Sequence, residues 1–325
     1  MTDDTGASAR LRIAILDDYQ GVATNIADWT SLAAQADVRS FTDHLTNQDD
    51  VVDRLADFDV VVAMRERTPF PRELLARLAR LRLLVTTGMR NASIDLRAAR
   101  ELGVLVSGTG MSATAPVELT WALLMALVRD VPGEDRRTRE GQWQRFLPLE
   151  LAGSTLGVVG LGRLGQRVAA IGQLFGMTVI AWSHNLTESA ASQFGVQRVE
   201  KSELFRRSDI VTIHTVLSTR TRDLIGLAEL ELLGRAGYLV NTSRGPIINE
   251  RALVEALTTG TIAGAALDVF DAEPLPAGHP LLTTPRTILS PHVGFVSRQA
   301  YAAMYAQVIQ DIAGWLDGKP LRVLG

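Results

Sequence analysis

Three residues that can bind an anion and move a proton each follow a short apolar segment in the C-terminal half of the chain. Arg244, Glu273 and His292 come after segments 238–241, 262–267 and 287–290, which have the composition of buried β-strands. The carboxyl ends of neighbouring parallel strands meet at one edge of a sheet, where open α/β sheets bind ligands. Each residue alone has an ordinary structural explanation: a surface arginine, a glutamate that caps a helix or a histidine in the core. The occurrence of all three at strand ends predicts that they share one site.

The three side chains suit the reduction of a 2-keto acid. A planar guanidinium such as that of Arg244 can hold a carboxylate and polarise a carbonyl through charge-assisted hydrogen bonds. A hydride arriving at the carbonyl carbon leaves charge on the oxygen, and His292 can donate a proton there near neutral pH. A neighbouring Glu273 carboxylate would favour the imidazolium and orient the ring. In the reverse direction His292 is the base that takes the hydroxyl proton.

A glycine-rich turn lies earlier in the chain, where Gly160-Leu-Gly162-Arg-Leu-Gly165 follows the apolar segment 155–160 and opens the amphipathic segment 164–177. The first glycine permits a tight turn, the second lets the backbone approach a pyrophosphate, and the third allows close packing of helix on strand. The same pattern also occurs in turns that only serve packing. The complete strand–turn–helix context favours a dinucleotide site.

The residues that would select the dinucleotide follow the next apolar segment, 178–182. An acid that binds the ribose 2′-hydroxyl of NAD is expected there, but the chain has Ser183, His184 and Asn185. No carboxylate repels the 2′-phosphate of NADP, and no arginine in this triplet attracts it. His184 can contribute when protonated, or can simply be a solvent-exposed loop residue. The choice between NAD and NADP stays open.

The elements that must position these residues are short apolar segments alternating with amphipathic ones along the whole chain. Strands alternating with helices predict an α/β fold with parallel sheets and right-handed crossovers. A loop at 141–153, rich in Gly, Pro and aromatic residues, is the expected internal boundary, and the last helix is expected at 297–316. The expected strands are 11–16, 60–64, 83–87, 104–107, 155–160, 178–182, 210–214, 238–241, 262–267 and 287–290.

Composition excludes several classes of site. The 325 residues suggest about two domains. The absence of cysteine excludes disulfides, Cys-ligated zinc, iron–sulfur clusters and a cysteine nucleophile, and we expect no metal site. A net charge of −3 argues against a nucleic-acid binder. The longest apolar run, 119–128, is about half of what a membrane span needs, and no signal core precedes Leu11. We therefore expect a cytoplasmic protein without membrane contact.

The chain resembles the D-isomer-specific 2-hydroxyacid dehydrogenases, the family of D-lactate, glyoxylate/hydroxypyruvate and D-3-phosphoglycerate dehydrogenases. The resemblance extends over nearly the whole chain, and the catalytic Arg, Glu and His of the family fall on Arg244, Glu273 and His292. Four motifs carry the resemblance: GLGRLG at 160–165, NTSRGPIIN at 241–249, LDVFDAEP at 267–274 and SPHVG at 290–294.

The resemblance implies two Rossmann-like parallel-sheet domains. A dinucleotide-binding domain, 108–294, is inserted into a flavodoxin-like substrate domain, 1–107 and 295–325, and the last helix returns to the N-terminal part. The expected partners are a small 2-keto or 2-hydroxy acid and a second copy of the chain. In such a homodimer, formed through the cofactor domain, Trp121 and Trp143 are expected to be buried between subunits.

The resemblance also implies cofactor contacts, with Asp268 at the nicotinamide. His214, at a strand end, is expected to cap the cofactor pocket rather than to catalyse. Val216 stands where the family usually has proline. The full set of expected cofactor contacts is Gly160, Gly162, Arg163, Leu164, Gly165, Ser183, His184, Asn185, His214, Thr221, Thr242, Ser243, Asp268 and Gly294.

Expected substrate contacts lie in the loop Gly88-Met89-Arg90 and at Arg65. The family usually has a second glycine where Arg90 stands. Arg90 either points to solvent or a helix, or adds a cation at the substrate mouth that favours a second acidic group. Arg65 either adds a second cation at the substrate mouth or forms a surface ion pair with Glu66 or packs on a helix.

Two other functions fit parts of this pattern. A formate-type dehydrogenase resembles this family but has Gln in place of the catalytic Glu, so Glu273 argues against it. A non-catalytic dinucleotide sensor, similar to the corepressors that share the fold, retains the three catalytic residues, although such proteins normally carry long partner-binding tails. Turnover of NAD(P)H with a panel of 2-keto acids distinguishes them.

Because Ser183 neither binds the 2′-hydroxyl bidentately nor repels a 2′-phosphate, the sequence predicts weak discrimination between the two cofactors. Ser183→Asp should shift preference towards NADH by roughly ten- to a thousandfold, chiefly through a higher KM for NADPH. Steady-state kinetics with both cofactors measure this. A wild-type chain that already prefers NADH beyond that range, and does not respond to the substitution, would show that Ser183 does not face the ribose.

Overall fold

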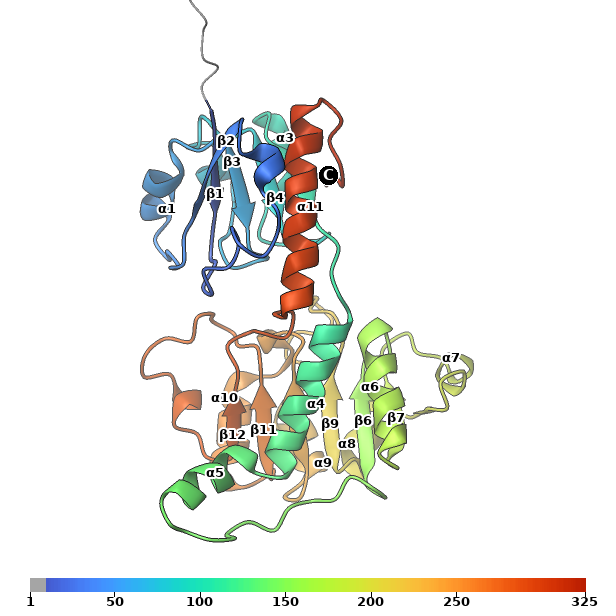
Figure 1. Ribbon diagram of the computed structural model, residues 1–325. Coiled ribbons are helices and arrows are strands. Elements are labelled where there is room, and N and C mark those ends of the chain that lie inside the picture. Colours follow the sequence, from blue (N-terminus) through green and yellow to red (C-terminus); the bar gives the residue numbers. More distant parts are fainter. Residues whose placement is uncertain (1–9) are drawn as a thin grey trace, which may run out of the picture. The chain divides into compact units, whose positions relative to one another are not determined.

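The computed structural model describes residues 10–325, which fold into two compact units (Figure 1). Of the described residues, the terminal unit comprises 10–112 together with Val296–Gly325, and the central unit is Ala113–Phe295. The domain boundaries expected from the family resemblance lie between residues 107 and 108 and between 294 and 295. In the structure the boundaries between the units lie between 112 and 113 and between 295 and 296. The expected boundary at 141–153 is wrong. That stretch is an irregular loop inside the central unit, because its Gly, Pro and aromatic residues interrupt helix formation without separating two cores.

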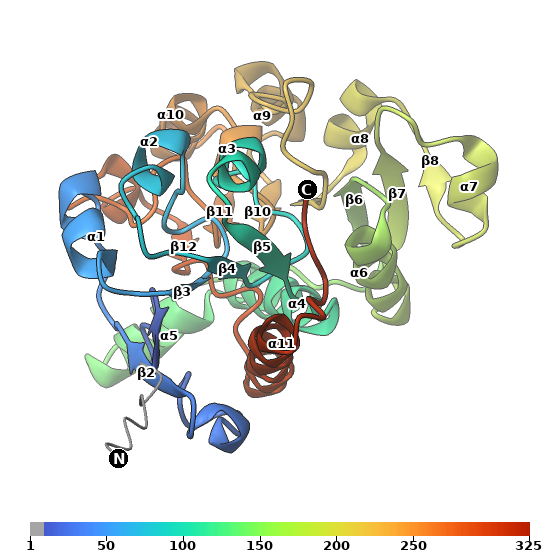
Figure 2. The same cartoon turned by 90° about the horizontal axis from the view of Figure 1, so that it is seen from above.

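The terminal unit is built on a five-stranded parallel sheet in the order β2-β1-β3-β4-β5. Apolar side chains from α1, α2 and α3 form a core on one face, and α11 contacts β4 and β5 (Figure 2). The strands are β1 (Leu11–Ile15), β2 (Ala36–Ser40), β3 (Val60–Ala63), β4 (Leu83–Thr86) and β5 (Leu105–Gly108). The helices are η1 (Thr30–Leu32), α1 (Gln48–Leu55), α2 (Arg72–Leu75), α3 (Leu96–Glu101) and α11 (Arg298–Leu316).

The central unit is built on a seven-stranded parallel sheet in the order β12-β11-β10-β9-β6-β7-β8. Its strands are β6 (Thr155–Val159), β7 (Thr178–Trp182), β8 (Gln197–Arg198), β9 (Ile210–Ile213), β10 (Tyr238–Asn241), β11 (Gly264–Leu267) and β12 (Thr287–Leu289). The strand order reverses between β6 and β9, and this is the switch point at whose carboxyl ends such sheets bind ligands.

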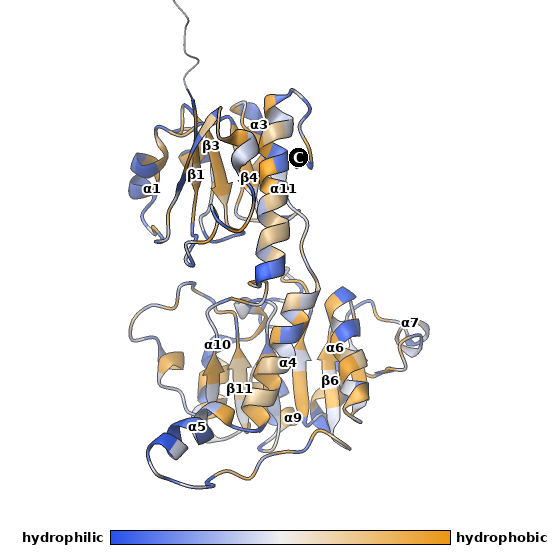
Figure 3. Cartoon of the chain, in the orientation of Figure 1, coloured by the Kyte–Doolittle hydropathy of each residue, from blue (hydrophilic) through white to orange (hydrophobic). Residues whose placement is uncertain are grey.

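Helices cover both faces of the central sheet, and the strands between them are hydrophobic (Figure 3). Side chains of α4 and α6 share a core with one face, and those of α8, α9 and α10 with the other. The helices are α4 (Thr114–Val128), α5 (Val131–Arg139), α6 (Arg163–Leu174), α7 (Glu188–Ser192), α8 (Lys201–Arg207), α9 (Leu227–Leu233), η2 (Gly245–Ile247), α10 (Glu250–Thr259) and η3 (Pro280–Leu282). Within residues 10–325, none of the helices has both the length and the apolar character for a membrane crossing.

All ten strands expected from the sequence are present, with ends that differ by at most two residues, whereas β2 and β8 are not predicted. Both are edge strands. β2 alternates buried and exposed residues and includes Asp37 and Arg39, and β8 has only two residues. Edge strands are half solvated, so they lack the continuous apolar run that marks a buried strand.

Trp121, on α4, is only 7% exposed, and its ring centroid lies 5.0 Å from that of Phe175 in the same unit. Burial of Trp121 between subunits is therefore the wrong expectation, because its own subunit already covers it. Trp143 is 74% exposed.

The last residues of the chain run antiparallel along β5. The Gly108 amide donates to the Arg322 carbonyl (3.0 Å), and the Leu324 amide donates to the Val106 carbonyl (2.8 Å). The Arg322 side chain holds this tail to α11, because its Nε donates to Oδ1 of the fully buried Asp311 at 3.0 Å. Burial raises the pKa of Asp311 to about 6, although the hydrogen bond and charge of Arg322 act in the opposite direction.

This raised pKa predicts how stability responds to pH. Between the ordinary Asp value of 3.8 and about 6, the native carboxyl retains its proton while the unfolded one loses it. The contribution of Asp311 is therefore present at low pH and is lost as the pH rises through about 6. Relative to Asp311→Asn, the wild type should lose roughly 2–4 kcal/mol of unfolding free energy across this window, measured by urea denaturation.

The exposed Asp317, just beyond the end of α11, gives the matched control Asp317→Asn. Subtracting the pH dependence of this variant isolates the part that belongs to the buried Asp311. An Asp311→Asn difference that varies with pH no more than that of Asp317→Asn would contradict the argument.

Candidate active site

The glycine-rich turn follows β6 directly, and two of its glycines are required by close backbone contacts. Gly160 has φ 100°, and a Cβ there would lie 2.7 Å from the Thr215 amide nitrogen. The Gly160 amide donates to the Trp182 carbonyl at 2.8 Å, which ties the turn to the end of β7. A Cβ on Gly165 would lie 2.0 Å from the Gly160 carbonyl oxygen. A side chain on Gly165 would push α6 away from the turn and β6, and a side chain on Gly160 would push the turn away from the start of the loop that follows β9.

Gly162 has a different role, because among residues 10–325 no atom beyond its own chain neighbours lies within 4 Å of the place where its Cβ would be. It is the N-cap of α6, and as a glycine it has no side chain that could accept from the first amides of that helix. Arg163 is exposed beside it, and Leu164 is half-buried. Open space in front of uncapped helix amides fits the pyrophosphate of a dinucleotide. These residues would hold NAD or NADP at this turn.

The loop after β7 carries the three residues expected at the ribose. Ser183 is half-buried, while His184 and Asn185 are exposed. The His184 ring packs edge-on against Trp182, with the centroids 4.9 Å apart. Its Nε2 donates to the Arg220 carbonyl at 3.3 Å. This loop is therefore tied to the loop that follows β9.

His214, at the end of β9, is not suited to proton transfer. Burial lowers its pKa to about 4, so the ring is neutral near neutral pH, and its Nε2 lies 2.8 Å from Thr212 Oγ1. The Thr221 hydroxyl is used inside its own loop, where it accepts from the Ser218 amide (2.7 Å) and donates to the Val216 carbonyl (2.6 Å). Both residues shape the loop between β9 and α9.

The turn after β10 is braced by Asn241, which sequence reasoning did not single out. The Asn241 side chain accepts from the Ser243 amide (3.0 Å) and donates to the Arg244 carbonyl (2.9 Å). Ser243 Oγ donates to the Thr215 carbonyl at 2.5 Å. The Thr242 hydroxyl lies 2.8 Å from that of Thr120 on α4. The turn is therefore fixed from both sides.

Gly245 brings this turn against the segment that follows β11. A Cβ on Gly245 would lie 2.1 Å from the Phe270 carbonyl carbon, so no other residue fits without moving the backbone. Arg244 precedes it, is half-buried, and donates from one guanidinium nitrogen to the Ser243 carbonyl at 2.7 Å. Its charge acts on Glu273. The sequence pattern identified Arg244 but not the reason for the glycine beside it.

Glu273 and His292 form a hydrogen-bonded pair. Glu273 Oε2 lies 2.5 Å from His292 Nδ1, and Oε1 accepts from the Phe270 amide at 2.9 Å. Burial alone would raise the Glu273 pKa, but the hydrogen bond and charge of His292, the Phe270 amide and the Arg244 charge together lower it. An ionised Glu273 requires a proton on Nδ1, so Nε2 is left for a substrate.

His292 is held in a left-handed backbone conformation, with φ 52°. Such a conformation costs free energy for a residue other than glycine and persists only where neighbours enforce it. Asp268, 1% exposed, accepts from the Val293 amide (2.9 Å) and the Gly294 amide (2.8 Å) and so fixes the residues after His292. Burial raises the Asp268 pKa, and hydrogen bonds from Ser290 and these amides act against it.

In the terminal unit, the structure brings Arg65 and Gly88 together at the ends of β3 and β4. A Cβ on Gly88 would lie 3.4 Å from a guanidinium nitrogen of Arg65, and the Arg65 amide donates to Thr87 Oγ1 at 3.0 Å. Arg65 Nε is 3.3 Å from the Glu66 carboxylate. The guanidinium also contacts the Met111 sulfur.

Met89 and Arg90 are both exposed. Within residues 10–325, no carboxylate forms an ion pair with Arg90, so its guanidinium is open both to solvent and to an acidic ligand.

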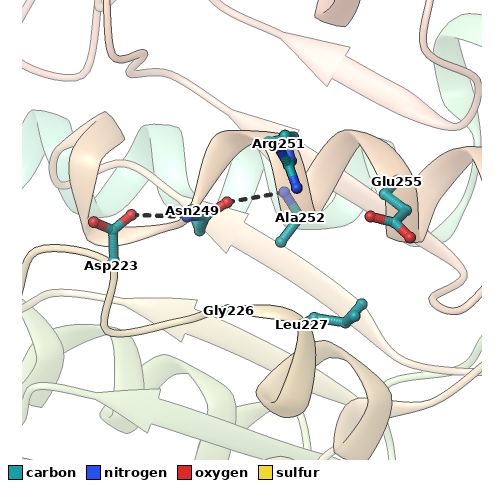
Figure 4. A pocket seen from close by; sticks show the side chains of 7 residues that line it. All are labelled: Asp223, Gly226, Leu227, Asn249, Arg251, Ala252 and Glu255. Carbon is teal, nitrogen blue, oxygen red and sulfur yellow. Dashed lines mark hydrogen bonds between the residues drawn. The ribbon is translucent and has the colours of Figure 1, made fainter.

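A pocket lies elsewhere, between α9 and α10 of the central unit (Figure 4). Its volume is about 450 Å³, and Asn249 at the start of α10 donates to Asp223 at 3.2 Å on its rim. None of the site residues expected from the sequence lines it. The lining residues are Asp223, Gly226, Leu227, Asn249, Arg251, Ala252 and Glu255.

Comparison with known proteins gives consistent matches. A model of the D-isomer specific 2-hydroxyacid dehydrogenase NAD binding domain matches residues 121–294. A glyoxylate reductase from Aeropyrum pernix is 38% identical over 76% of this chain and 77% of its own. A D-3-phosphoglycerate dehydrogenase from Methanocaldococcus jannaschii is 36% identical over 84% of this chain, which spans about half (52%) of that relative. The solved structure of a phosphoglycerate oxidoreductase from Vibrio cholerae is 32% identical, with a TM-score of 0.90, covering 95% of this chain and 99% of that one.

Gly162→Ala tests whether the space before α6 holds a pyrophosphate. The φ of −86° suits alanine and the added methyl meets no atom, so the unfolding temperature should not change. The methyl would obstruct the approach of the phosphates, so the Kd for NADH and NADPH should rise about tenfold or more. Calorimetric titration measures this.

Gly165→Ala is the contrasting control, since its methyl collides with the Gly160 carbonyl and should lower the unfolding temperature. Unchanged cofactor affinity in Gly162→Ala would place the dinucleotide elsewhere.

Proposed function

Because this chain belongs to the D-isomer specific 2-hydroxyacid dehydrogenase family, we propose that it reduces a small 2-keto acid to the D-2-hydroxy acid with Arg244, Glu273 and His292 as its catalytic residues. The family resemblance and the fold class predicted from the sequence are confirmed, and the chain is an NAD(P)-dependent oxidoreductase. The observation that carries the finer assignment is the 2.5 Å contact between Glu273 and His292, with Arg244 close enough to lower the Glu273 pKa.

Each of the three residues has a defined role in the proposed reaction. The Arg244 guanidinium binds the substrate carboxylate and polarises the carbonyl. Bound NAD(P)H supplies the hydride. His292 Nε2 donates a proton to the carbonyl oxygen as charge develops there, and in the oxidation direction the same nitrogen accepts the hydroxyl proton. Glu273 keeps the Nδ1 proton in place and stabilises the imidazolium.

The predicted cofactor contacts form a consistent set around the carboxyl ends of the central sheet. The three glycines of the turn, Arg163 and Leu164 would hold the pyrophosphate, and Ser183 to Asn185 the adenosine ribose. Asp268 and Gly294 would face the nicotinamide from the segment that carries His292. Thr221, Thr242 and Ser243 would shape the loops between the adenosine end and the nicotinamide end of the cofactor. His214 would form part of the wall of the cofactor pocket.

The substrate is proposed as a small 2-keto acid whose size is left open. Relatives are named for glyoxylate and for D-3-phosphoglycerate, so the family handles acids with and without a phosphate. Gly88 and Met89 are the proposed contacts to the substrate in the terminal unit. Arg65 and Arg90 add positive charge at the same strand ends, which favours an acidic group beyond the keto acid.

The other functions are less well supported. A formate-type enzyme has Gln instead of the catalytic Glu, and the ionised Glu273 in contact with His292 suits keto acid reduction instead. A non-catalytic sensor is not favoured, because the similar curated proteins are named as reductases and dehydrogenases.

His292→Ala removes the proposed proton donor. We expect kcat to fall by about 10²–10⁴-fold with glyoxylate or hydroxypyruvate, while the Kd for NAD(P)H stays close to the wild-type value. Stopped-flow or steady-state absorbance of NAD(P)H and calorimetric titration give the two quantities. Undiminished turnover in the variant would end the assignment.

We propose further that the chain forms a homodimer through its central unit. The 141–153 loop exposes apolar side chains that a monomer leaves in water: Trp143 is 74% exposed and Leu147 is 94% exposed. Light scattering at micromolar concentration should give twice the mass of 35.3 kDa, and Leu147→Asp should shift the population towards the monomer. A monomeric wild type at that concentration would contradict the proposal.

A further inference from the structure

The loop that selects the cofactor has no arginine of its own, but the fold places one beside it. Arg220, 36 positions after His184, accepts a hydrogen bond at its carbonyl from His184 Nε2 (3.3 Å). The His184 ring is itself fixed by its edge-on contact with the buried Trp182. The residue next to Ser183 therefore joins the loop after β7 to the loop after β9.

The loop that carries Arg220 is held at the cofactor edge by contacts along its length. At its start, Thr215 lies against Gly160 of the dinucleotide turn and accepts from Ser243 Oγ at 2.5 Å. At its end, the Thr221 hydroxyl closes a turn on Ser218 and Val216. The backbone of Arg220 therefore belongs to a turn that is fixed by hydrogen bonds, so the fold determines where this turn lies relative to the dinucleotide turn.

The charges around this loop leave Arg220 available to an anion. Arg220 is exposed, and no carboxylate in the described part of the chain forms an ion pair with it. Its neighbour Arg222 serves a different group, because the Arg222 charge acts on Asp271. Ser183 offers a hydroxyl and no negative charge. A guanidinium and a hydroxyl, with no repelling carboxylate, are the groups that bind a phosphate monoester.

From this arrangement we infer that Arg220, Ser183 and His184 form a binding site for the 2′-phosphate of NADPH. The guanidinium of Arg220 donates to the phosphate oxygens, Ser183 donates its hydroxyl, and His184 positions Arg220 through the bond to its carbonyl. The inference deepens the proposed function and rests on it for the placement of the dinucleotide. It also changes the expectation from the sequence, since the cation missing from residues 183–185 comes from another loop.

The test uses adenosine nucleotides that carry or lack the 2′-phosphate, so its readout does not depend on turnover. Calorimetric titration of the full chain with 2′,5′-ADP and with 5′-AMP gives a ratio of dissociation constants. In the wild type the ratio should favour 2′,5′-ADP by about tenfold or more. Arg220→Ala should reduce that preference at least about tenfold, and Arg220→Lys should restore part of it because Lys retains the charge without the bidentate geometry.

Arg222→Ala is the matched control, because it removes the same charge from the same loop and should leave the ratio unchanged. A wild type that does not prefer 2′,5′-ADP, or equal effects of Arg220→Ala and Arg222→Ala, would overturn the inference. Loss of binding to both nucleotides in the wild type would instead contradict the dinucleotide site itself, whereas inactivity towards keto acids with normal nucleotide binding would contradict only the proposed reaction.

Discussion

Close contact between loop backbones at the carboxyl ends of the central sheet is the constraint on which the site depends. Gly160 lies against Thr215, Gly165 against Gly160, and Gly245 against Phe270, each at a separation that leaves no room for a side chain. The first contact joins the loops after β6 and β9, and the last joins the loops after β10 and β11. The bond from Ser243 Oγ to the Thr215 carbonyl connects the two pairs. The proposed catalytic side chains therefore project from loops that are held against one another.

Within these loops, buried polar groups determine where the proposed catalytic side chains lie. Asn241 fixes the turn that carries Arg244, and Asp268 fixes the amides that follow His292. Each buried acceptor is paired with backbone donors, which is the condition under which a buried polar group costs little. The two amides that donate to Asp268 directly follow His292 and help to hold it in its left-handed conformation, in which its ring contacts Glu273.

Much of this arrangement was predictable, since Arg244, Glu273, His292 and the glycine turn are defined by local patterns at strand ends. What was not predictable depends on contacts between residues that are distant along the chain. The bond from His184 to the Arg220 carbonyl has no local pattern, and the burial of Trp121 by Phe175 depends on how α4 meets the end of α6. The boundary expected at 141–153 failed because loop composition reports irregular backbone and not the separation of two cores.

The tail along β5 has a consequence for the terminal unit as a whole. In that five-stranded sheet β5 is an edge strand, and an edge normally presents a row of unpaired amides and carbonyls to any passing strand. Here Arg322 and Leu324 occupy part of that row, and the fully buried Asp311 anchors Arg322. The chain thus caps its own sheet edge, which makes β5 a poor template for intermolecular strand pairing.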